Sequence, residues 1–103
     1  MFDLEETVMG LIINAGMSRS LCLEALRQAR AGQFAEADDL LRQAAEAANA
    51  AHAVQTRLIE ADEGEGKIPV TLILVHAQDH LMTAMLAREL VTELIELHRK
   101  LAA

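Results

Sequence analysis

Residues 70–80 read VTLILVHAQDH, and this stretch decides the fold. Its first residues are apolar almost without interruption, so a helix built from them is apolar on every side and must be buried all round. We expect this helix to begin at Pro69, which suits a first helical turn, and to run to about Leu101. One small bundle cannot cover so much apolar surface, so the chain is expected to associate with copies of itself in a closed ring.

Two further helices are predicted upstream of this stretch. Asp3 suits an N-cap, and apolar residues recur at helical spacing from there until Gly32 ends the first helix. Gly10 and Gly16 are unfavourable inside a helix, and they predict the close approach of another backbone. A second helix, with a stripe of small residues, is expected over residues 34–61, and the glycine-rich segment 62–69 forms the main loop.

Length and composition indicate a single domain that spans residues 1–103, with no break along the chain. Hydrophobic residues make up 52% of the chain but aromatic residues only 2%, which favours close helix packing over sheets. Three helices with short connections predict an all-α protein, an antiparallel three-helix bundle.

Charge and cysteine usage exclude several classes of protein. The formal net charge is −7 and the basic residues are scattered, which argues against a partner made of nucleic acid. Cys22 is the only cysteine, so no disulfide can form within the chain, and the composition fits a reducing compartment. The sequence shows neither a signal peptide nor a membrane-spanning run, so we expect a cytoplasmic protein without membrane insertion.

A ribbon of polar residues interrupts the apolar third helix. Residues at helical spacing lie along one side of a helix, and this side carries His76, Asp79, His80 and Thr83. Buried polar groups need partners or a purpose. The simplest interpretation is structural: the two histidines and Asp79 satisfy one another and nearby amides.

A metal site is the second interpretation of the ribbon. The order His76, Asp79, His80 resembles the inverted zinc motif His-x-x-Glu-His, in which two histidines bind zinc and the acid acts as a base. Asp is one methylene shorter than Glu, and no residue stands out as a third ligand. A helical metal-binding oligomer or a metallohydrolase therefore remains an alternative on a weak motif.

A nucleophilic histidine is the third interpretation. A neutral imidazole is available near neutral pH, and its ring nitrogen can attack phosphorus to give a reversible phosphohistidine. His80 and Gln78 could then donate hydrogen bonds to the phosphoryl oxygens. Such chemistry depends mainly on positioning and charge stabilisation, and it needs few residues.

Ordered motifs across nearly the whole chain favour this third interpretation. They are VMGLII at 8–13, Gly16 with SRS at 18–20, VQTRLI at 54–59, GEGK at 64–67 and, above all, VHAQDHLM at 75–82. On these motifs the chain resembles the lactose/cellobiose-type enzyme IIA of the bacterial sugar phosphotransferase system, and it looks most like the N,N'-diacetylchitobiose-specific branch.

The resemblance implies a homotrimer of three-helix subunits, a nine-helix assembly that acts as a phosphocarrier. His76 would accept a phosphoryl group from phospho-HPr and pass it to a cysteine of enzyme IIB during uptake of a β-linked disaccharide of the chitobiose, cellobiose or lactose type. Asp79 would meet its two symmetry mates around one Mg²⁺ ion, since a hard cation offsets the repulsion of three converging carboxylates. His80 and Gln78 remain candidate stabilisers of the phosphoryl group.

The remaining polar and sulfur-containing residues receive simpler interpretations. Cys22 is expected to be a small core residue, and His98 to favour the helix dipole. His52 and Gln55 could lie beside the site, but surface or core packing is the simpler expectation. Methionines at helical spacing are more often core than partner-binding residues, and this applies to Met9, Met17, Met82 and Met85.

Overall fold

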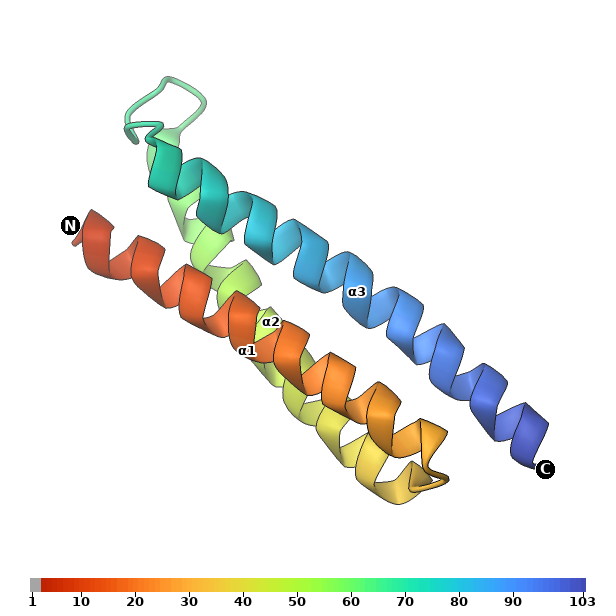
Figure 1. The fold of residues 1–103 in the computed structure, drawn as a ribbon. Helices are drawn as coiled ribbons and strands as arrows, with labels where there is room; N and C mark the ends of the chain where they lie inside the picture. Colours follow the sequence, from red (N-terminus) through yellow and green to blue (C-terminus); the bar gives the residue numbers. More distant parts are fainter. Residues whose placement is uncertain (1–2) are drawn as a thin grey trace.

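The computed structural model describes residues 3–103, which form three helices: α1 (Leu4–Arg30), α2 (Phe34–Asp62) and α3 (Leu72–Ala102). Successive helices run in opposite directions, so α1 and α3 point the same way (Figure 1). The molecule is a rod of 53 × 20 × 19 Å. The prediction of an all-α, antiparallel three-helix bundle is confirmed for the described residues.

The ends of α1 form as the sequence predicts. The Asp3 carboxylate accepts a hydrogen bond from the backbone N–H of Glu6, at 3.1 Å, and so caps the first turn. Gly32 ends the helix with φ +81°, a left-handed conformation that glycine adopts without steric cost. The chain then reverses within a few residues into α2.

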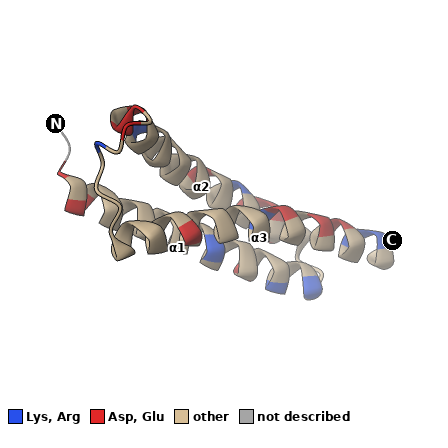
Figure 2. Ribbon diagram, turned by 90° about the horizontal axis from the view of Figure 1, so that it is seen from above, with Lys and Arg blue, Asp and Glu red and all other residues tan. Residues whose placement is uncertain are grey.

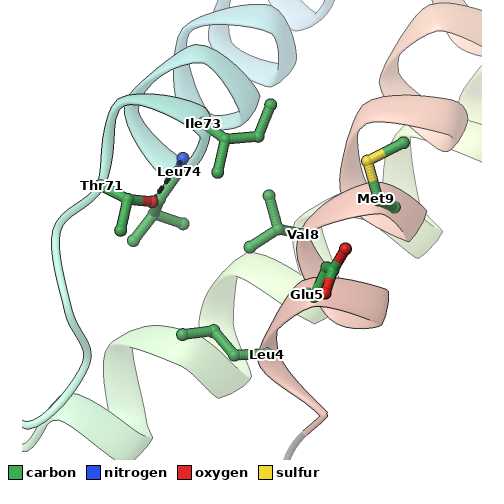
Figure 3. Close-up of a pocket in the computed structure, with 7 residues that line it drawn as sticks. All are labelled: Leu4, Glu5, Val8, Met9, Thr71, Ile73 and Leu74. Atoms are coloured by element: carbon green, nitrogen blue, oxygen red, sulfur yellow. Dashed lines mark hydrogen bonds between the residues drawn. The ribbon is translucent and has the colours of Figure 1, made fainter.

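The start of α3 differs from the prediction. The helix begins at Leu72 rather than at Pro69, because the Thr71 hydroxyl accepts a hydrogen bond from the backbone N–H of Leu74, at 3.2 Å (Figure 3). Pro69 therefore lies in the connection between α2 and α3. In that connection the Asp62 carboxylate accepts a hydrogen bond from the N–H of Ile68 at 2.9 Å, and this bond fixes the path of the loop.

The helix α1 lies at the centre of the packing. It contacts both other helices extensively, whereas α2 and α3 contact each other least. Between α1 and α2, the buried Ser18 hydroxyl donates a hydrogen bond to the carbonyl of Ala44 at 2.9 Å. The buried residues form two clusters along the rod. The first comprises Val8, Leu11, Ala15, Ala51, Leu58, Leu74, Ala77, Leu81 and Ala84, and the second Cys22, Ala25, Ala29, Ala37, Ala44, Val91 and Ile95.

A single chain does not bury the apolar start of α3 on all sides, as expected if one bundle is too small to cover it. Leu72 is 86% exposed and Val75 50% exposed, whereas Leu74 is buried. A helix on the outside of a three-helix bundle can bury only one stripe against its neighbours. The large side chains on the opposite side of α3 therefore remain uncovered, and self-association stays a prediction.

The charged residues are unevenly placed on α3. Among Asp, Glu, Lys and Arg, only Asp79 occurs within residues 72–87, whereas the second half of the helix carries several such residues (Figure 2). The first half thus presents a nearly uncharged surface around one carboxylate. None of the helices in the described part of the chain is long and apolar enough to cross a membrane.

Candidate functional site

The position of α3 on the bundle decides which residues of the polar ribbon face solvent. Leu74, Ala77, Leu81 and Ala84 are buried, and their spacing of three and four residues marks the inward face of the helix. His76, Asp79 and Thr83 are exposed on the other side, and His80 is half-buried between the two faces. The expected buried ribbon is therefore a surface feature of the single chain.

The two histidines of the ribbon lie against each other. The ring centroids of His76 and His80 are 6.0 Å apart and the rings are inclined by 24°, which is a stacked arrangement. One turn of helix separates the two residues, so their rings follow one another along the same side. His76 is the outer member of the pair, open to a partner molecule, and His80 is the inner member.

The inner histidine is seated against α1. Its Nε2 atom lies 3.3 Å from the position that a Cβ atom would occupy at Gly16. At Gly10, by contrast, an added Cβ meets nothing within 4 Å. The prediction that both glycines admit another backbone is therefore wrong within this chain: Gly16 faces an imidazole, and Gly10 faces open space.

Gln78 is turned towards α2 instead of towards His76. Its side-chain oxygen accepts a hydrogen bond from Nε2 of Gln55, and the same Gln55 nitrogen lies 3.8 Å from the sulfur of Met82. Of the two interpretations of Gln55, general packing and a place beside the candidate site, the structure supports the second, because Gln55 holds Gln78. This pairing was not predictable from the sequence, since the two residues are on different helices.

Asp79 is the only carboxylate in the polar ribbon, and it lies on the exposed side of α3. The Thr83 hydroxyl donates a hydrogen bond to the backbone carbonyl of Asp79 at 3.0 Å. Thr83 therefore bonds the backbone of Asp79 and not its carboxylate. Across residues 3–103, no three His, Cys, Asp or Glu side chains gather closely enough to hold a metal ion. One chain thus provides no third ligand for the metallohydrolase alternative, and a site at Asp79 would need carboxylates from other copies.

The cysteine and the two histidines outside the polar ribbon lie partly in the core and partly on the surface. Cys22 is fully buried, and burial raises the pKa of its thiol above the ordinary value. It is therefore the small core residue that the sequence predicts. His52 is exposed on α2, and His98 is half-buried near the end of α3.

The methionines differ from the expectation that they are core residues. Met9, Met17 and Met82 are 45%, 50% and 53% exposed, respectively, and only Met85 packs against the first core cluster. The core prediction is wrong for three of the four, because these three lie on the outward sides of α1 and α3. Met9 also lines an apolar pocket between the starts of α1 and α3, together with Leu4 and Ile73 (Figure 3).

A comparison of the sequence with models of known protein families gives a match. The sequence model for the lactose/cellobiose-specific IIA subunit of the PTS matches residues 6–99. The chain belongs to the PTS lactose/cellobiose IIA family. The match covers all three helices and the polar ribbon, so the resemblance drawn from the ordered motifs is confirmed.

Several relatives and solved structures are similar to this chain over nearly its whole length. The N,N'-diacetylchitobiose-specific EIIA component of Escherichia coli (strain K12) is 65% identical over 101 residues, which are 98% of this chain and 87% of the relative. The solution structure of the IIA(chitobiose)–HPr complex of E. coli contains a chain that is 63% identical and covers both chains completely, with a TM-score of 0.87. The cellobiose-specific enzyme IIA of Bacillus anthracis is 43% identical, with a TM-score of 0.93 over 99% of this chain and 94% of that one.

Proposed function

We propose that this PTS IIA component carries a phosphoryl group on His76, which it takes from phospho-HPr and gives to a cysteine of enzyme IIB. The observation that carries this proposal is the exposed imidazole of His76, stacked on His80 in a nearly uncharged part of α3. The E. coli relative solved with HPr supports the identity of the donor. The site of these exchanges is proposed to be the cytoplasm.

The chemistry requires little beyond an accessible nitrogen and a nearby donor. An unprotonated ring nitrogen of His76 attacks phosphorus, and the bond from phosphorus to HPr breaks as the new N–P bond forms. In the second transfer the N–P bond breaks while the IIB thiolate forms an S–P bond. His80 is the neighbour placed to donate a hydrogen bond to the phosphoryl group, whereas Gln78 would first have to leave Gln55.

The transported sugar is proposed to be a β-linked disaccharide, with N,N'-diacetylchitobiose as the first candidate. The identity of 65% to the diacetylchitobiose-specific relative supports this choice over cellobiose or lactose. A direct test mixes the phosphorylated protein with the IIB proteins of these systems in turn. Faster transfer to the chitobiose IIB than to a cellobiose IIB would support the assignment, and the reverse order would replace it.

A homotrimer is proposed as the working form. The exposed side of α3 carries Asp79, Leu86, Leu90 and Leu97, at the spacing of four and seven residues that brings helices together around a common axis. Three chains joined in this way would also bring three Asp79 carboxylates together. Asp79 fits a shared Mg²⁺ site, since carboxylate oxygens suit this hard cation and it would offset their mutual repulsion.

The phosphocarrier proposal is tested by incubating the protein with phosphoenolpyruvate, enzyme I and HPr, followed by intact mass at neutral pH. The wild type should gain one acid-labile phosphate, and His76→Gln should gain none. His52→Gln is the matched control, because His52 is also exposed but lies on α2 away from the ribbon. If the wild type stays unmodified while HPr is shown to be phosphorylated, the proposal fails.

The metal proposal needs a separate test. Asp79→Leu should remove bound magnesium, measured by elemental analysis of the purified protein, while the molar mass by light scattering stays that of a trimer. Replacing a charge that must be desolvated by an apolar side chain is often neutral or stabilising. A wild-type trimer with no bound divalent cation would contradict the metal proposal and leave the phosphocarrier proposal intact.

A further inference from the structure

Gly16 is placed where glycine is not needed for the backbone. It lies inside α1, and the residues of the described chain with positive φ do not include it. Glycine is unfavourable in a helix interior, where alanine is the best residue. A structural reason for glycine at this position must therefore be sought in the missing side chain.

The missing side chain makes space for one group. The atom that a Cβ at Gly16 would meet within 4 Å is Nε2 of His80, at 3.3 Å. A real Cβ atom is seldom this close to a neighbour, so the imidazole would have to shift by some tenths of an ångström. Such a shift is passed on to any side chain in direct contact with the ring, because closely packed groups leave little room to absorb it.

The imidazole that would have to shift also contacts the proposed nucleophile. His80 stacks on His76, with ring centroids 6.0 Å apart. A displacement of the inner ring therefore changes the orientation of the outer ring or of the hydrogen-bond donor beside it. We propose that Gly16 is a positioning residue for phosphoryl transfer: its missing side chain provides the space in which His80 lies against His76.

This inference has a geometric part and a kinetic part, and only the kinetic part rests on the proposed function. The geometric part, that Gly16 determines the position of the His80 ring, applies to the unphosphorylated protein. The two parts are therefore tested by different measurements, so that their failures can be told apart.

The geometric measurement is NMR of the imidazole rings in the unphosphorylated full-length protein. Gly16→Ala should shift the ring signals of both His80 and His76, whereas those of His52 and His98 should stay in place. Gly10→Ala is the matched control. Gly10 lies on the same helix, and a methyl group added there meets nothing within 4 Å. Unchanged His76 and His80 signals in Gly16→Ala would overturn the inference.

The kinetic measurement is the rate of phosphoryl transfer from phospho-HPr. Small misplacements of reacting groups are costly, and we expect Gly16→Ala to be about tenfold slower than the wild type, with Gly10→Ala unchanged. The same substitution should have no further effect in a His80→Ala background, because it acts through His80. An equal loss with and without His80 would overturn the positioning role.

Folding of the variant is checked by its thermal transition. Alanine is the better helix former, so Gly16→Ala should fold. Should it fail to fold, the double variant Gly16→Ala, His80→Ala decides: recovery of folding supports the contact with His80, and continued failure contradicts it. A wild type that accepts no phosphate would end the proposed function, while the ring signals would still decide the role of Gly16.

Discussion

At the scale of single residues, the division between an outer and an inner histidine explains how one helix can serve two partners. A nucleophile that meets two proteins in turn has to be reachable from solvent, and His76, the proposed nucleophile, is exposed. The hydrogen-bond donor beside it has to stay in place while the partner proteins exchange. His80, the residue proposed for this role, is half-buried against α1. Accessibility and fixed geometry are thus assigned to different side chains one turn apart.

The pair of Gln55 and Gln78 should couple α2 to α3 measurably. Each amide loses its partner when the other is replaced by alanine, and a hydrogen bond between partly buried side chains contributes about 0.5–1.5 kcal/mol. A double-mutant cycle by urea unfolding should therefore give a coupling energy of about 0.5–1 kcal/mol between Gln55→Ala and Gln78→Ala. Additive effects would show that the two amides separate in solution.

Cys22 should make the stability depend on pH at the alkaline end. Burial raises the pKa of its thiol in the folded protein above the ordinary value of 9.0, while Arg88 and Ser18 act in the opposite direction. The stabilising contribution is thus complete below the ordinary pKa and is lost as the pH rises through the higher folded value. The free energy of unfolding should fall by at most about 1.4 kcal/mol per pH unit from this thiol.

The measurement for Cys22 is urea unfolding at intervals from about pH 8 to about pH 10, a range that brackets the ordinary thiol pKa. Cys22→Ala serves as the control, since it keeps the other titrating groups and lacks the thiol. Its curve should be flatter above the ordinary thiol pKa. Two curves of the same slope would mean that the thiol ionises as easily in the folded as in the unfolded chain.

At the scale of elements, the start of α3 should depend on one hydroxyl. Thr71→Ala removes the cap on the N–H of Leu74 and should lower the free energy of unfolding by about 1 kcal/mol. Thr92→Ala is the matched control, because the Thr92 hydroxyl bonds within its own helix to the Arg88 carbonyl and alanine has the higher helix propensity. The control should be neutral or stabilising, and equal losses in both would argue against a cap.

Helix boundaries were predictable where a local signal stood alone. Asp3 and Gly32 mark the ends of α1 because each acts on its own turn of chain, and the structure confirms both. The start of α3 was misplaced because two local signals competed: Pro69 favours a first turn, but Thr71 offers a side-chain acceptor closer to the apolar residues. Sequence alone does not rank two such signals.

The site was predictable along one helix and not between helices. The order of His76, Asp79 and His80 is a property of α3 alone, and helical spacing brings the two histidines together, as the structure confirms. The partners of His80 and Gln78 lie on α1 and α2, which only the folded chain brings near. Which side of α3 is exposed in the single chain was not predictable for the same reason, since it depends on how the helices pack.

At the scale of the whole molecule, the uncovered side of α3 should decide assembly. Leu90 is 56% exposed and lies on the side of the helix that carries Asp79. We expect Leu90→Glu to convert the proposed trimer to monomers, because three carboxylates near one axis would repel and resist desolvation. Ile59→Glu is the control, since Ile59 is 60% exposed but belongs to α2. Light scattering with size-exclusion chromatography distinguishes the outcomes, and a Leu90→Glu trimer would exclude this side as the interface.

The central place of α1 has a consequence for the order in which the protein matures during synthesis. Neighbouring helices joined by a short turn make local contacts, which form before distant ones. The hairpin of α1 and α2 can therefore assemble as soon as both have left the ribosome, whereas α3, with His76, docks last and mainly onto α1. A nascent or prematurely ended chain would then hold a folded hairpin without the histidine that we propose takes up phosphate.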